Sequence, residues 1–408
     1  MLPQGWLRRP LGDIAQITSG GTPDRSTPSY WGGTIPWLTT GEIQFNTITD
    51  STEKITEFGL KNSSAKLFPA GTLLMAMYGQ GKTRGQIAQL GIEAATNQAC
   101  AAILFDASND PNFYFQYLAS QYEELRELGN AGTQKNLNGG ILKRILVPVP
   151  PVGEQRRIAH ILSTWDQAIA TTERLLANAR AQRKVLTNRL FIHGRHSSMT
   201  THGWKFADLG EIFERVTRRN SAANSNVLTI SGTRGLVSQR DYFNKSVASE
   251  NLAGYTLLER GEFAYNKSYS AGYPMGAIKP LTRYDQGVVS SLYICFRLRD
   301  GAEADADFFR HYFEEGMLNE GLSGIAQEGA RNHGLLNVGV GDFFKLRLHI
   351  PDVTEQRRIA AILNMAEQKE RLITAQLGKL RDEKKALMSQ LLTGKRRVRL
   401  PADEAAHA

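Results

Sequence analysis

One six-residue stretch occurs twice in this chain, and the rest of the sequence is arranged around its two copies. Residues 154–159 read Glu-Gln-Arg-Arg-Ile-Ala, and residues 355–360 repeat the same letters. Each copy follows a short apolar segment that ends in proline, and each then continues for almost 40 residues without another proline. An uninterrupted helical pattern of this length predicts a long helix that needs a partner along its side.

Apolar residues recur in both copies at alternating spacings of four and three, which is the repeat of a coiled coil. They are Ile158, Leu162, Trp165, Ile169, Leu176, Ala179, Leu186 and Leu190 in the first copy, and Ile359, Leu363, Ala366, Ile373, Leu377, Leu380, Leu387 and Leu391 in the second. Polar residues interrupt this coiled-coil seam at Thr172, Arg183, Glu370 and Lys384. Two such helices in one chain most simply pack against each other. The alternative is two amphipathic helices in separate cores.

The repeat extends beyond the helices. Gly5-Trp6 matches Gly203-Trp204, residues 69–74 resemble residues 259–264, and residues 112–117 resemble residues 307–312. The sequence therefore predicts a tandem duplication of mixed α/β (α+β) units, each followed by a long helix. The expected segments are a first globular unit at 1–150, a helix at 151–199, a second unit at 200–351, a helix at 352–398 and a tail at 399–408.

Within the globular units, short apolar runs bounded by Gly, Pro, Asn and Ser predict strands. These runs are Leu73–Met77, Ala101–Phe105, Val227–Ile230 and Leu292–Phe296. Helical spacing predicts one helix over Phe113–Leu128 and another over Phe308–Leu322. Long polar loops connect these elements, among them residues 19–26 and 133–138, and loops of that size commonly carry function.

The net charge of +9 is not spread evenly along the chain. Residues 1–150 and 200–351 are each neutral, whereas residues 151–199 carry a net charge of +5 and residues 352–408 carry +4. The basic excess therefore lies on the two helical segments. Basic side chains near helix C-termini favour the helix dipole, and they also suit nucleic acid or an acidic partner. Composition leaves both interpretations open.

The remaining composition limits the class of protein. The chain has no apolar run long enough to span a membrane and no signal peptide pattern, so we expect a cytoplasmic protein. Cys100 and Cys295 lie inside apolar runs, and we expect both to be buried small hydrophobes rather than disulfide or metal-binding cysteines.

Motifs for catalysis are missing. Residues 76–83 approach a phosphate-binding loop, but Ala76 replaces its first glycine and a strand rather than a helix is predicted to follow. The histidines and cysteines lack zinc-ligand spacing, and Gly-x-Ser-x-Gly is absent. The chain also lacks the Asp-Pro-Pro-Tyr or Asn-Pro-Pro-Tyr motif of DNA amino-methyltransferases. The sequence therefore favours binding over chemistry, and we expect no metal site.

Polar loop residues of the types that read DNA are the candidate contacts. Arg and Lys pair with guanine edges, Asn and Gln pair with adenine, and all four reach phosphate oxygens. The candidates are Gln80, Lys82, Arg84, Gln134, Lys135 and Asn136 in the first unit, and Arg234, Asn266, Lys267, Arg331, Asn332 and His333 in the second. Polar loops are also polar because they are solvated, so ordinary surface roles remain open for each.

With these features together, the chain resembles the specificity (S) subunits of type I restriction–modification systems. The resemblance rests on the doubled segments 150–159 and 351–360 with their long helices. It also rests on Ser19-Gly20-Gly21-Thr22-Pro23, on Tyr30-Trp31-Gly32-Gly33 and on the ending Leu391-Leu392-Thr393-Gly394. The second unit lacks the Ser-Gly-Gly-Thr-Pro opening, which prevents residue-by-residue transfer between the two units.

The resemblance implies two target recognition domains in a pseudo-two-fold arrangement, joined by an antiparallel pair of long helices. Each domain would read one half of a bipartite double-stranded DNA site, and the helix pair would set the spacing. Two modification (methyltransferase) subunits and the restriction (translocase/endonuclease) subunits would be partners. S-adenosylmethionine would then belong to the modification subunit, and ATP and Mg to the restriction subunit, leaving no cofactor in this chain.

Two other functions compete with this interpretation. A nuclease or methyltransferase that acts alone would need a catalytic motif, which the sequence does not contain. An orphan or protein-binding scaffold with duplicated heads would have no DNA target. Salt-dependent binding to duplex DNA separates the scaffold from a DNA reader, because phosphate contacts give a steep salt dependence.

Overall fold

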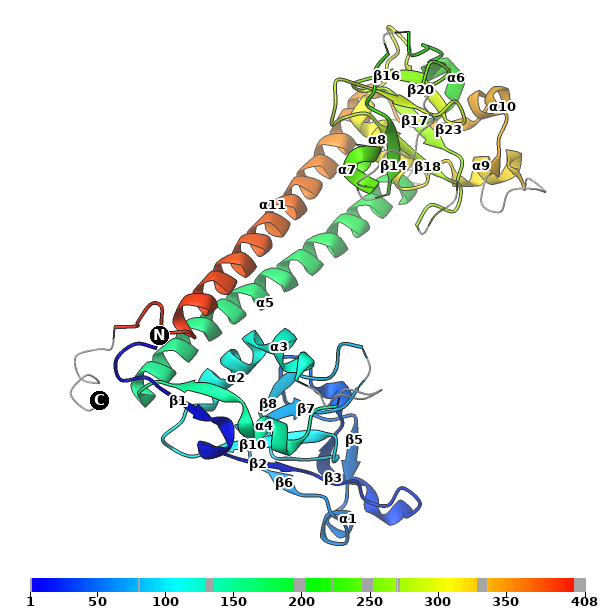
Figure 1. The fold of residues 1–408 in the computed structure, drawn as a ribbon. Helices are drawn as coiled ribbons and strands as arrows, with labels where there is room; N and C mark the ends of the chain where they lie inside the picture. The colour runs from blue at the N-terminus through cyan, green and yellow to red at the C-terminus, as the bar shows by residue number, and fades with distance from the viewer. Residues whose placement is uncertain are drawn as a thin grey trace. The chain divides into compact units, whose positions relative to one another are not determined.

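The computed structural model describes residues 2–79, 81–128, 136–193, 203–221, 223–232, 234–243, 252–268, 270, 272–328 and 336–399. The chain divides into two compact units (Figure 1). Unit 1 consists of residues 1–173 and 375–408, and unit 2 of residues 174–374. The boundary falls within the two long helices, so each unit contains part of both.

Unit 1 is a mixed α/β unit. Its strands are β1 (Leu7–Pro10), β2 (Ala15–Ser19), β3 (Trp31–Leu38), β4 (Thr47–Ile48), β5 (Glu53–Ile55), β6 (Leu67–Phe68), β7 (Leu73–Ala76), β8 (Ile87–Leu90), β9 (Ala94–Thr96), β10 (Cys100–Phe105) and β11 (Leu146–Val149). Its helices are α1 (Glu57–Lys61), α2 (Pro111–Ser120), α3 (Tyr122–Glu127) and α4 (Gly139–Arg144). The central sheet has the order β2-β10-β7-β8-β4, beside a second sheet β5-β3-β9-β6 and the ribbon β1-β11.

Unit 2 is built from a similar set of elements. Its strands are β12 (Lys205–Asp208), β13 (Phe213–Arg215), β14 (Leu228–Ser231), β15 (Gly235–Ser238), β16 (Thr256–Glu259), β17 (Phe263–Asn266), β18 (Ala277–Pro280), β19 (Gln286–Val289), β20 (Ile294–Leu298), β21 (Gln327–Glu328), β22 (Leu336–Asn337) and β23 (Arg347–Ile350). Its helices are α6 (Leu209–Ile212), α7 (Gln239–Phe243), α8 (Ala306–Glu314), α9 (Asn319–Ile325) and α10 (Val340–Phe344). The mixed α/β class predicted from the sequence is confirmed for both units.

The sheets of the two units follow the same plan. The central sheet of unit 2 has the order β13-β20-β17-β18. The strands β2-β10-β7-β8 of unit 1 have the same order when the strands of each sheet are ranked by their position in the chain. The ribbon β12-β23 corresponds to β1-β11, and the antiparallel pair β16-β19 corresponds to β6-β9. Unit 1 pairs Trp37 with Ala95 in parallel, and unit 2 has a parallel bridge between Val227 and Val288.

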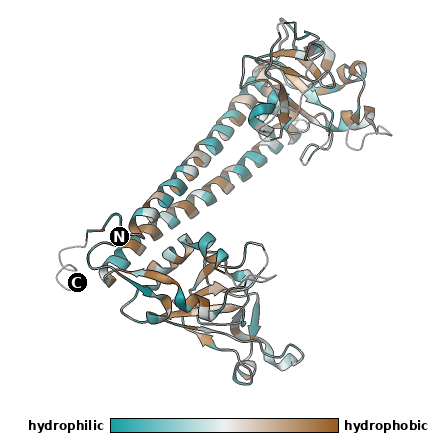
Figure 2. Cartoon of the chain, in the orientation of Figure 1, coloured by the Kyte–Doolittle hydropathy of each residue, from teal (hydrophilic) through white to brown (hydrophobic). Residues whose placement is uncertain are grey.

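Two long helices, α5 (Val152–Asn188) and α11 (Val353–Leu391), continue from one unit into the other. Hydrophobic and hydrophilic residues alternate along both (Figure 2). None of the twenty predicted seam positions is exposed. The start of α5 packs with the end of α11 in the core of unit 1, and the start of α11 packs in the core of unit 2. The side chains at the seam positions are at least partly buried, as the predicted seam requires.

Polar seam residues pair between the two helices inside each unit. In unit 2, Arg183 Nε lies 2.7 Å from Glu370 Oε1. In unit 1, Lys384 Nζ lies 2.6 Å from Asp166 Oδ1. Of the four polar residues that interrupt the predicted seam, Arg183, Glu370 and Lys384 thus form ion pairs with the other long helix. The fourth, Thr172, donates its hydroxyl to the carbonyl of Ala168 in its own helix.

The glutamine of each repeated hexapeptide fixes the long helix to its unit. Gln155 is fully buried and donates to the Pro150 carbonyl at 2.8 Å, while its Oε1 accepts from the Asp110 amide at 2.8 Å. Gln356 makes the same two contacts, with Pro351 at 2.9 Å and Asp305 at 3.0 Å. Because Asp110 and Asp305 are the N-caps of α2 and α8, each glutamine joins a long helix to the N-terminus of one of these two helices.

The structure corrects two helix predictions. The helix predicted over Phe113–Leu128 is interrupted at Gln121, where α2 ends and α3 begins. The helix predicted over Phe308–Leu322 is interrupted after α8, where Gly316 has a φ of +68°, a value that side chains with a Cβ rarely adopt. The strand predicted over Leu292–Phe296 lies two residues later, at Ile294–Leu298.

The glycine-rich opening of unit 1 is a packing motif. A Cβ on Gly20 would lie 2.0 Å from the Thr96 carbonyl oxygen, so only glycine fits at this contact. Trp37 is 1% exposed and donates its indole N–H to the Gly21 carbonyl at 3.0 Å. These contacts join the end of β2 to β3 and β9. Packing therefore explains why glycine and tryptophan occupy these positions, and no contact to a ligand is needed to explain them.

Two expectations drawn from composition can be compared with the structure. Cys100 and Cys295 are both buried and unpaired, and burial raises the pKa of each thiol to about 12. The prediction of two buried small hydrophobes is confirmed. Among the helices that the structure describes, none combines the length and the apolar character that a membrane crossing requires.

Candidate nucleic-acid interface

The connection between β7 and β8 in unit 1 is a glycine-rich loop held in place by α3. Gly79, Gly81 and Gly85 all have positive φ angles, a backbone form that glycine adopts without strain. Arg126 Nη2 donates to the Gly81 carbonyl at 2.7 Å, and the Tyr122 hydroxyl donates to the Lys82 carbonyl. The loop leads into strand β8 and not into a helix, which agrees with the rejection of a phosphate-binding loop.

The predicted contacts on this loop differ in their surroundings. Lys82 is exposed and available to a ligand. Arg84 is half-buried, and its Nη2 donates to the Arg126 carbonyl at 3.1 Å. Part of the Arg84 guanidinium is thus engaged in fixing the loop to α3. Gln80, between them, lies outside the described residues.

A second polar segment reaches the base of the same loop. The Leu137 amide donates to the Met77 carbonyl at 3.0 Å, which places the half-buried Asn136 beside the start of the loop. Gln134 and Lys135 lie outside the described residues. The structure therefore brings together two segments, 77–86 and 136–137, that the sequence gives only as separate polar stretches.

Unit 2 repeats this main-chain contact with different side chains. The Leu336 amide donates to the Lys267 carbonyl at 3.0 Å, and Lys267 directly follows β17 as Met77 directly follows β7. The Asn266 side chain accepts from the Ser268 amide at 3.2 Å, so its oxygen helps to shape the turn. Arg331, Asn332 and His333, which precede Leu336, lie outside the described residues.

Arg234 lies at the turn between β14 and β15 and is exposed. Two side chains that the sequence analysis did not select bind the main chain of this turn. Lys279 Nζ and the Tyr273 hydroxyl both donate to the Gly232 carbonyl, at 3.1 and 2.9 Å. Lys279 is 7% exposed and forms an ion pair with Glu314. A lysine within the apolar run Ala277–Pro280 was the available sequence signal.

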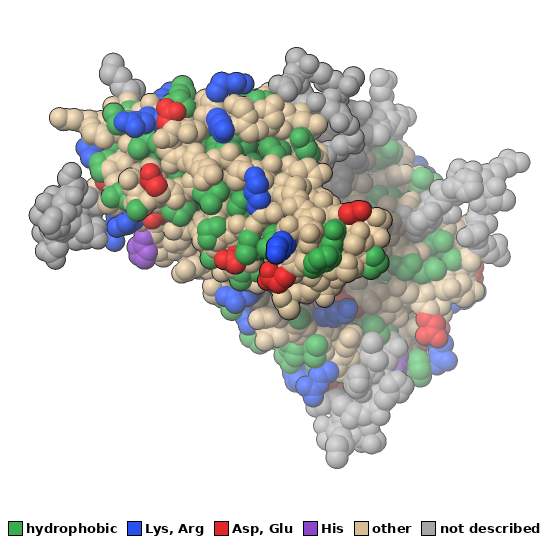
Figure 3. Space-filling view, turned by 90° about the horizontal axis from the view of Figure 1, so that it is seen from below, with side chains coloured by type: hydrophobic (Ala, Val, Ile, Leu, Met, Phe, Trp, Pro, Cys, Tyr) green, Lys and Arg blue, Asp and Glu red, His purple; other side chains and the backbone are tan. Residues whose placement is uncertain are grey.

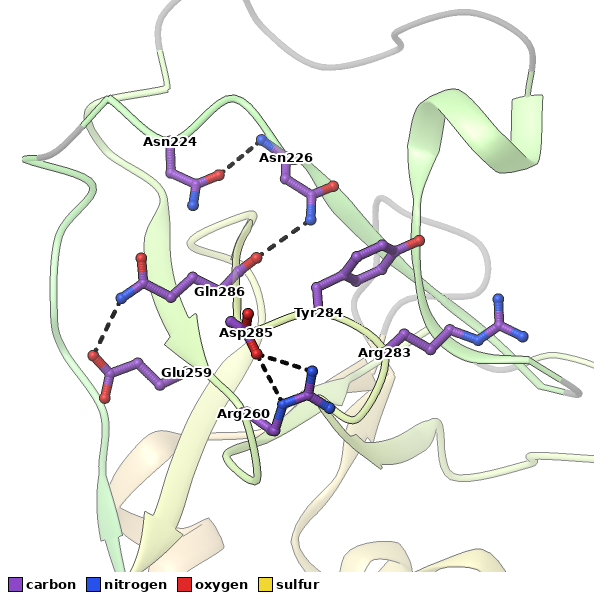
Figure 4. Close-up of a pocket in the computed structure, with 8 residues that line it drawn as sticks. All are labelled: Asn224, Asn226, Glu259, Arg260, Arg283, Tyr284, Asp285 and Gln286. Carbon is purple, nitrogen blue, oxygen red and sulfur yellow. Dashed lines mark hydrogen bonds and ion pairs between the residues drawn. The ribbon is translucent and has the colours of Figure 1, made fainter.

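Unit 2 also has an open polar pocket of about 740 Å³ that the sequence did not indicate. Figure 4 shows its lining, which is Asn224, Asn226, Glu259, Arg260, Arg283, Tyr284, Asp285 and Gln286. Arg260 is bound to Asp285 at 2.9 Å, whereas no ion pair joins Arg283 to any acid in the described part of the chain. Amides beside a guanidinium are the side chains that read base edges. The closely spaced asparagines at 220, 224 and 226 are the sequence feature that could have indicated this pocket.

The charges on the surface are dispersed. Figure 3 shows Lys and Arg side chains scattered among Asp, Glu and hydrophobic side chains over one face of the chain. This agrees with the neutral charge of residues 1–150 and 200–351. Contacts to an anionic ligand on these units would therefore be local, from particular loops. Among the described residues, no group of three or more His, Cys, Asp or Glu could hold a metal ion.

Comparison with known proteins identifies the class. Residues 3–180 match the family model described as type I restriction modification DNA specificity domain. The chain is 28% identical over 193 residues to the type I restriction enzyme MjaIX specificity subunit of Methanocaldococcus jannaschii, an alignment that covers 45% of this chain and 42% of the relative. It is 25% identical over 166 residues to the EcoR124I/EcoR124II specificity subunit of Escherichia coli, which covers 38% and 40%. The chain thus matches about two fifths of the length of these relatives.

Solved structures show the same fold over nearly the whole chain. The crystal structure of a type I restriction–modification S subunit from M. genitalium aligns with a TM-score of 0.58 and 17% identity, covering 96% of both chains. A structure described under complex assembly and conformational transition of the type I R-M system aligns with a TM-score of 0.57 and 17% identity, covering 97% of this chain and all of the other. At these identities the likeness concerns the fold.

The sequence matches thus relate residues 3–180 to a type I restriction modification DNA specificity domain. The curated relatives are type I restriction enzyme specificity subunits, in agreement with the resemblance based on the repeated hexapeptides and the glycine-rich opening. Specificity subunits are non-catalytic, in agreement with the lack of catalytic motifs in the sequence.

Proposed function

We propose that the chain is the DNA-recognition subunit of a type I restriction–modification complex and reads a bipartite, asymmetric site with one unit for each half. The observation that carries this proposal is a shared geometry with different loop chemistry. In unit 1 the Leu137 amide donates to the carbonyl of Met77, which directly follows β7. In unit 2 the Leu336 amide donates to the carbonyl of Lys267, which directly follows β17. The side chains on the segments that make these contacts differ between the units, as two different half-sites would require.

The duplication supports this assignment. We propose two target recognition domains, at 1–150 and 200–351, joined by antiparallel coiled-coil helices at 151–199 and 352–398. The shared strand order of the central sheets and the matched contacts of Gln155 and Gln356 support a common origin of the units. In this arrangement the helix pair sets the separation between half-sites, as fixed geometry does in other DNA-binding proteins.

The proposed partners follow from the family. The helix pair would carry two adenine-methylating modification subunits, with the restriction subunits bound outside them in the cytoplasm. S-adenosylmethionine would be bound by the modification subunit, and ATP with Mg by the restriction subunit. Methylation of adenine within a duplex requires that the base leave the stack, so recognition and base flipping would be divided between subunits.

A genome-wide map of N6-methyladenine tests this proposal directly. The map compares cells that contain the neighbouring modification subunit with and without this chain. The expected result is a two-part motif that vanishes when the chain is deleted. Replacing residues 1–150 with the corresponding unit of another specificity subunit should then change one half of the motif. A change in both halves would contradict independent recognition by the two units.

A protein-binding scaffold without a DNA target is the competing function. Purified chain with its modification subunit should bind the mapped site, and its affinity should fall steeply with salt because phosphate contacts release counterions. Affinity that does not depend on salt, or that is equal for the mapped site and for scrambled duplex, would favour the scaffold.

A further inference from the structure

A basic pocket of about 570 Å³ lies in unit 1 beside the start of α5 and the end of α11. Its lining combines four arginines with four aliphatic side chains, namely Arg157, Ile161, Leu387, Leu391, Arg396, Arg397, Val398 and Arg399. The aliphatic residues belong to or pack against the core of unit 1, whereas the arginines are exposed. The pocket thus has an apolar floor and a cationic rim.

One wall of this pocket is fixed by a buried carboxylate. Glu154 is 2% exposed and forms an ion pair with Arg397, whose Nη1 also donates to the Gln4 carbonyl at 3.0 Å. The Trp6 indole N–H donates to Glu154 Oε2 at 3.3 Å. Arg397 therefore ties the segment after α11 both to the start of α5 and to the N-terminal segment, while Trp6 holds the carboxylate that Arg397 binds.

Comparison with the second hexapeptide shows how the Glu154–Arg397 ion pair affects the neighbouring arginine, Arg157. In unit 2, Glu355 binds Arg358 within its own helix, with both Nε–Oε2 and Nη2–Oε1 distances at 2.6 Å. The corresponding pair in unit 1 would be Glu154 and Arg157, but Glu154 is engaged by Arg397. In the described part of the chain, no ion pair involves Arg157, Arg396 or Arg399. The same hexapeptide thus presents an unpaired arginine at the pocket in unit 1 and a neutralised one in unit 2.

The composition of the pocket selects its ligand. A phosphate backbone needs cations but gains nothing from aliphatic side chains between them. An acidic peptide that carries a leucine-like residue fits both parts, because its apolar side chain can cover the floor while carboxylates meet the guanidinium groups. We propose that this pocket binds an acidic, amphipathic segment of a protein partner. The inference does not depend on DNA recognition by either unit.

The test uses the full chain and a short fluorescein-labelled peptide of Glu and Leu, followed by anisotropy. The wild-type chain should bind this peptide, and the double variant Arg157→Ala, Arg396→Ala should bind it roughly tenfold more weakly, the loss expected for two exposed charge pairs. Arg358→Ala is the matched control from the second hexapeptide and should leave the affinity unchanged. Unchanged thermal unfolding of all variants shows that the fold is intact.

Several results would overturn the proposal. Failure of the wild-type chain to bind the peptide, or equal binding by the double variant, would remove the assigned site. Equal affinity for a polyglutamate peptide without leucine, or competition by random duplex DNA at this site, would indicate a general polyanion surface. Binding that appears only in the variant Asp403→Asn, Glu404→Gln would assign the pocket to the chain's own acidic C-terminal sequence instead of a partner.

Discussion

Units 1 and 2 support their candidate recognition turns by different means. In unit 1 the glycine-rich loop after β7 is held from α3, where Arg126 and Tyr122 donate to main-chain carbonyls of the loop. In unit 2 the turn that carries Arg234 is held by buried Lys279 of β18 and by half-buried Tyr273, which both donate to the Gly232 carbonyl. In both units these donors bind main-chain carbonyls of the turn and not the side chains of the turn, so the exposed residues of each turn can change without loss of its support.

The origin of the difference is visible in one sheet position. Lys279 of β18 pairs with Ala264 of β17, whereas the corresponding strands of unit 1 place Ala88 opposite Leu74. A buried alanine cannot support a turn, and unit 1 uses helix α3 for that purpose. The two units thus share a strand order but not the residues that shape their surfaces. The comparison predicts that changes in shared elements affect the whole chain and that changes in these supports affect one unit.

Breaking a long helix should have the largest effect. Leu176 is 7% exposed in the middle of the α5 seam. Leu176→Pro should destabilise the chain by about 3 kcal/mol or more, because proline removes a backbone hydrogen bond and kinks the helix. Urea unfolding followed by circular dichroism measures the loss, and site-specific DNA binding should be lost with it. The neighbouring Leu175 is 53% exposed, and Leu175→Ala should stay within about 0.5 kcal/mol of the wild type.

Retention of tight, site-specific binding by Leu176→Pro would contradict the role of the helix pair in spacing the half-sites. Binding of a single half-site by this variant, with loss of the bipartite site, would instead sharpen the comparison. It would show that each unit reads DNA by itself and that the helices supply only the separation.

Removing the buried cation of unit 2 should have the next largest effect. Lys279→Met leaves the carboxylate of Glu314 and the carbonyl of Gly232 without this donor, and we expect a loss of roughly 3 kcal/mol because a partly buried charge becomes uncompensated. Chemical unfolding measures the change. Lys54→Ala, which removes an exposed ion pair with Asp50 in unit 1, should cost less than about 1 kcal/mol.

The same variant tests whether the support serves recognition. If the Arg234 turn contacts DNA, Lys279→Met should weaken discrimination in one half of the methylation motif and leave the other half unchanged. Equal relaxation of both halves would mean that the effect passes through stability of the whole chain and not through this turn.

The repeated glutamines should give equal effects in the two units. Gln155→Ala and Gln356→Ala each leave an N-cap amide and a proline carbonyl without a buried partner, and each should destabilise the chain by about 2 kcal/mol. Gln182→Ala, on an exposed helix face, is the control and should change little. Thermal unfolding of the three variants measures the difference. A loss at Gln155 with none at Gln356 would show that the matched contacts are not equivalent in energy.

How much of this structure the sequence predicts depends on the range of the interactions. The long helices α5 and α11 could be predicted because helical periodicity is local, and the positions assigned to their seam are at least partly buried. The breaks at Gln121 and Gly316 were missed, since short helices within a continuous apolar pattern differ from one long helix only at their ends. The contact from Gln155 to Asp110 could not be predicted, because it joins residues distant in sequence.

The candidate interface was predicted less well than the fold, for a similar reason. Polar loop composition suggested Lys82 and Arg234, and both are exposed. The same criterion selected Arg84 and Asn266, whose side chains make local contacts that hold their own loops. Residue type alone does not separate a polar group that faces solvent from one that supports the backbone. The role of each of these residues in DNA binding stays a prediction.

The smallest expected effect is a change in how the stability of the chain depends on pH. It comes from His311, which titrates, at a position where unit 1 has a glutamine. Buried His311 of α8 occupies the place that Gln116 has in α2, and each bonds to its long helix, through Asn364 at 2.9 Å and Asp166 at 2.7 Å. Burial, together with the cation of Arg310, lowers the pKa of His311 below its usual 6.5. The unfolded chain therefore binds more protons between the lowered pKa and about 6.5, so stability rises with pH through that window and is lost as pH falls.

His311→Gln places the unit 1 residue in unit 2 and should flatten this part of the pH dependence. The measurement is the free energy of unfolding in urea at pH about 7.5 and about 5.5, on either side of the ordinary histidine pKa. The wild type should lose more stability between the two than the variant. Asp307 and Glu367, which also face His311, are present in both chains, so their titration cancels in the comparison. An equal loss in both would mean that other groups set the pH response and that burial of His311 does not contribute to it.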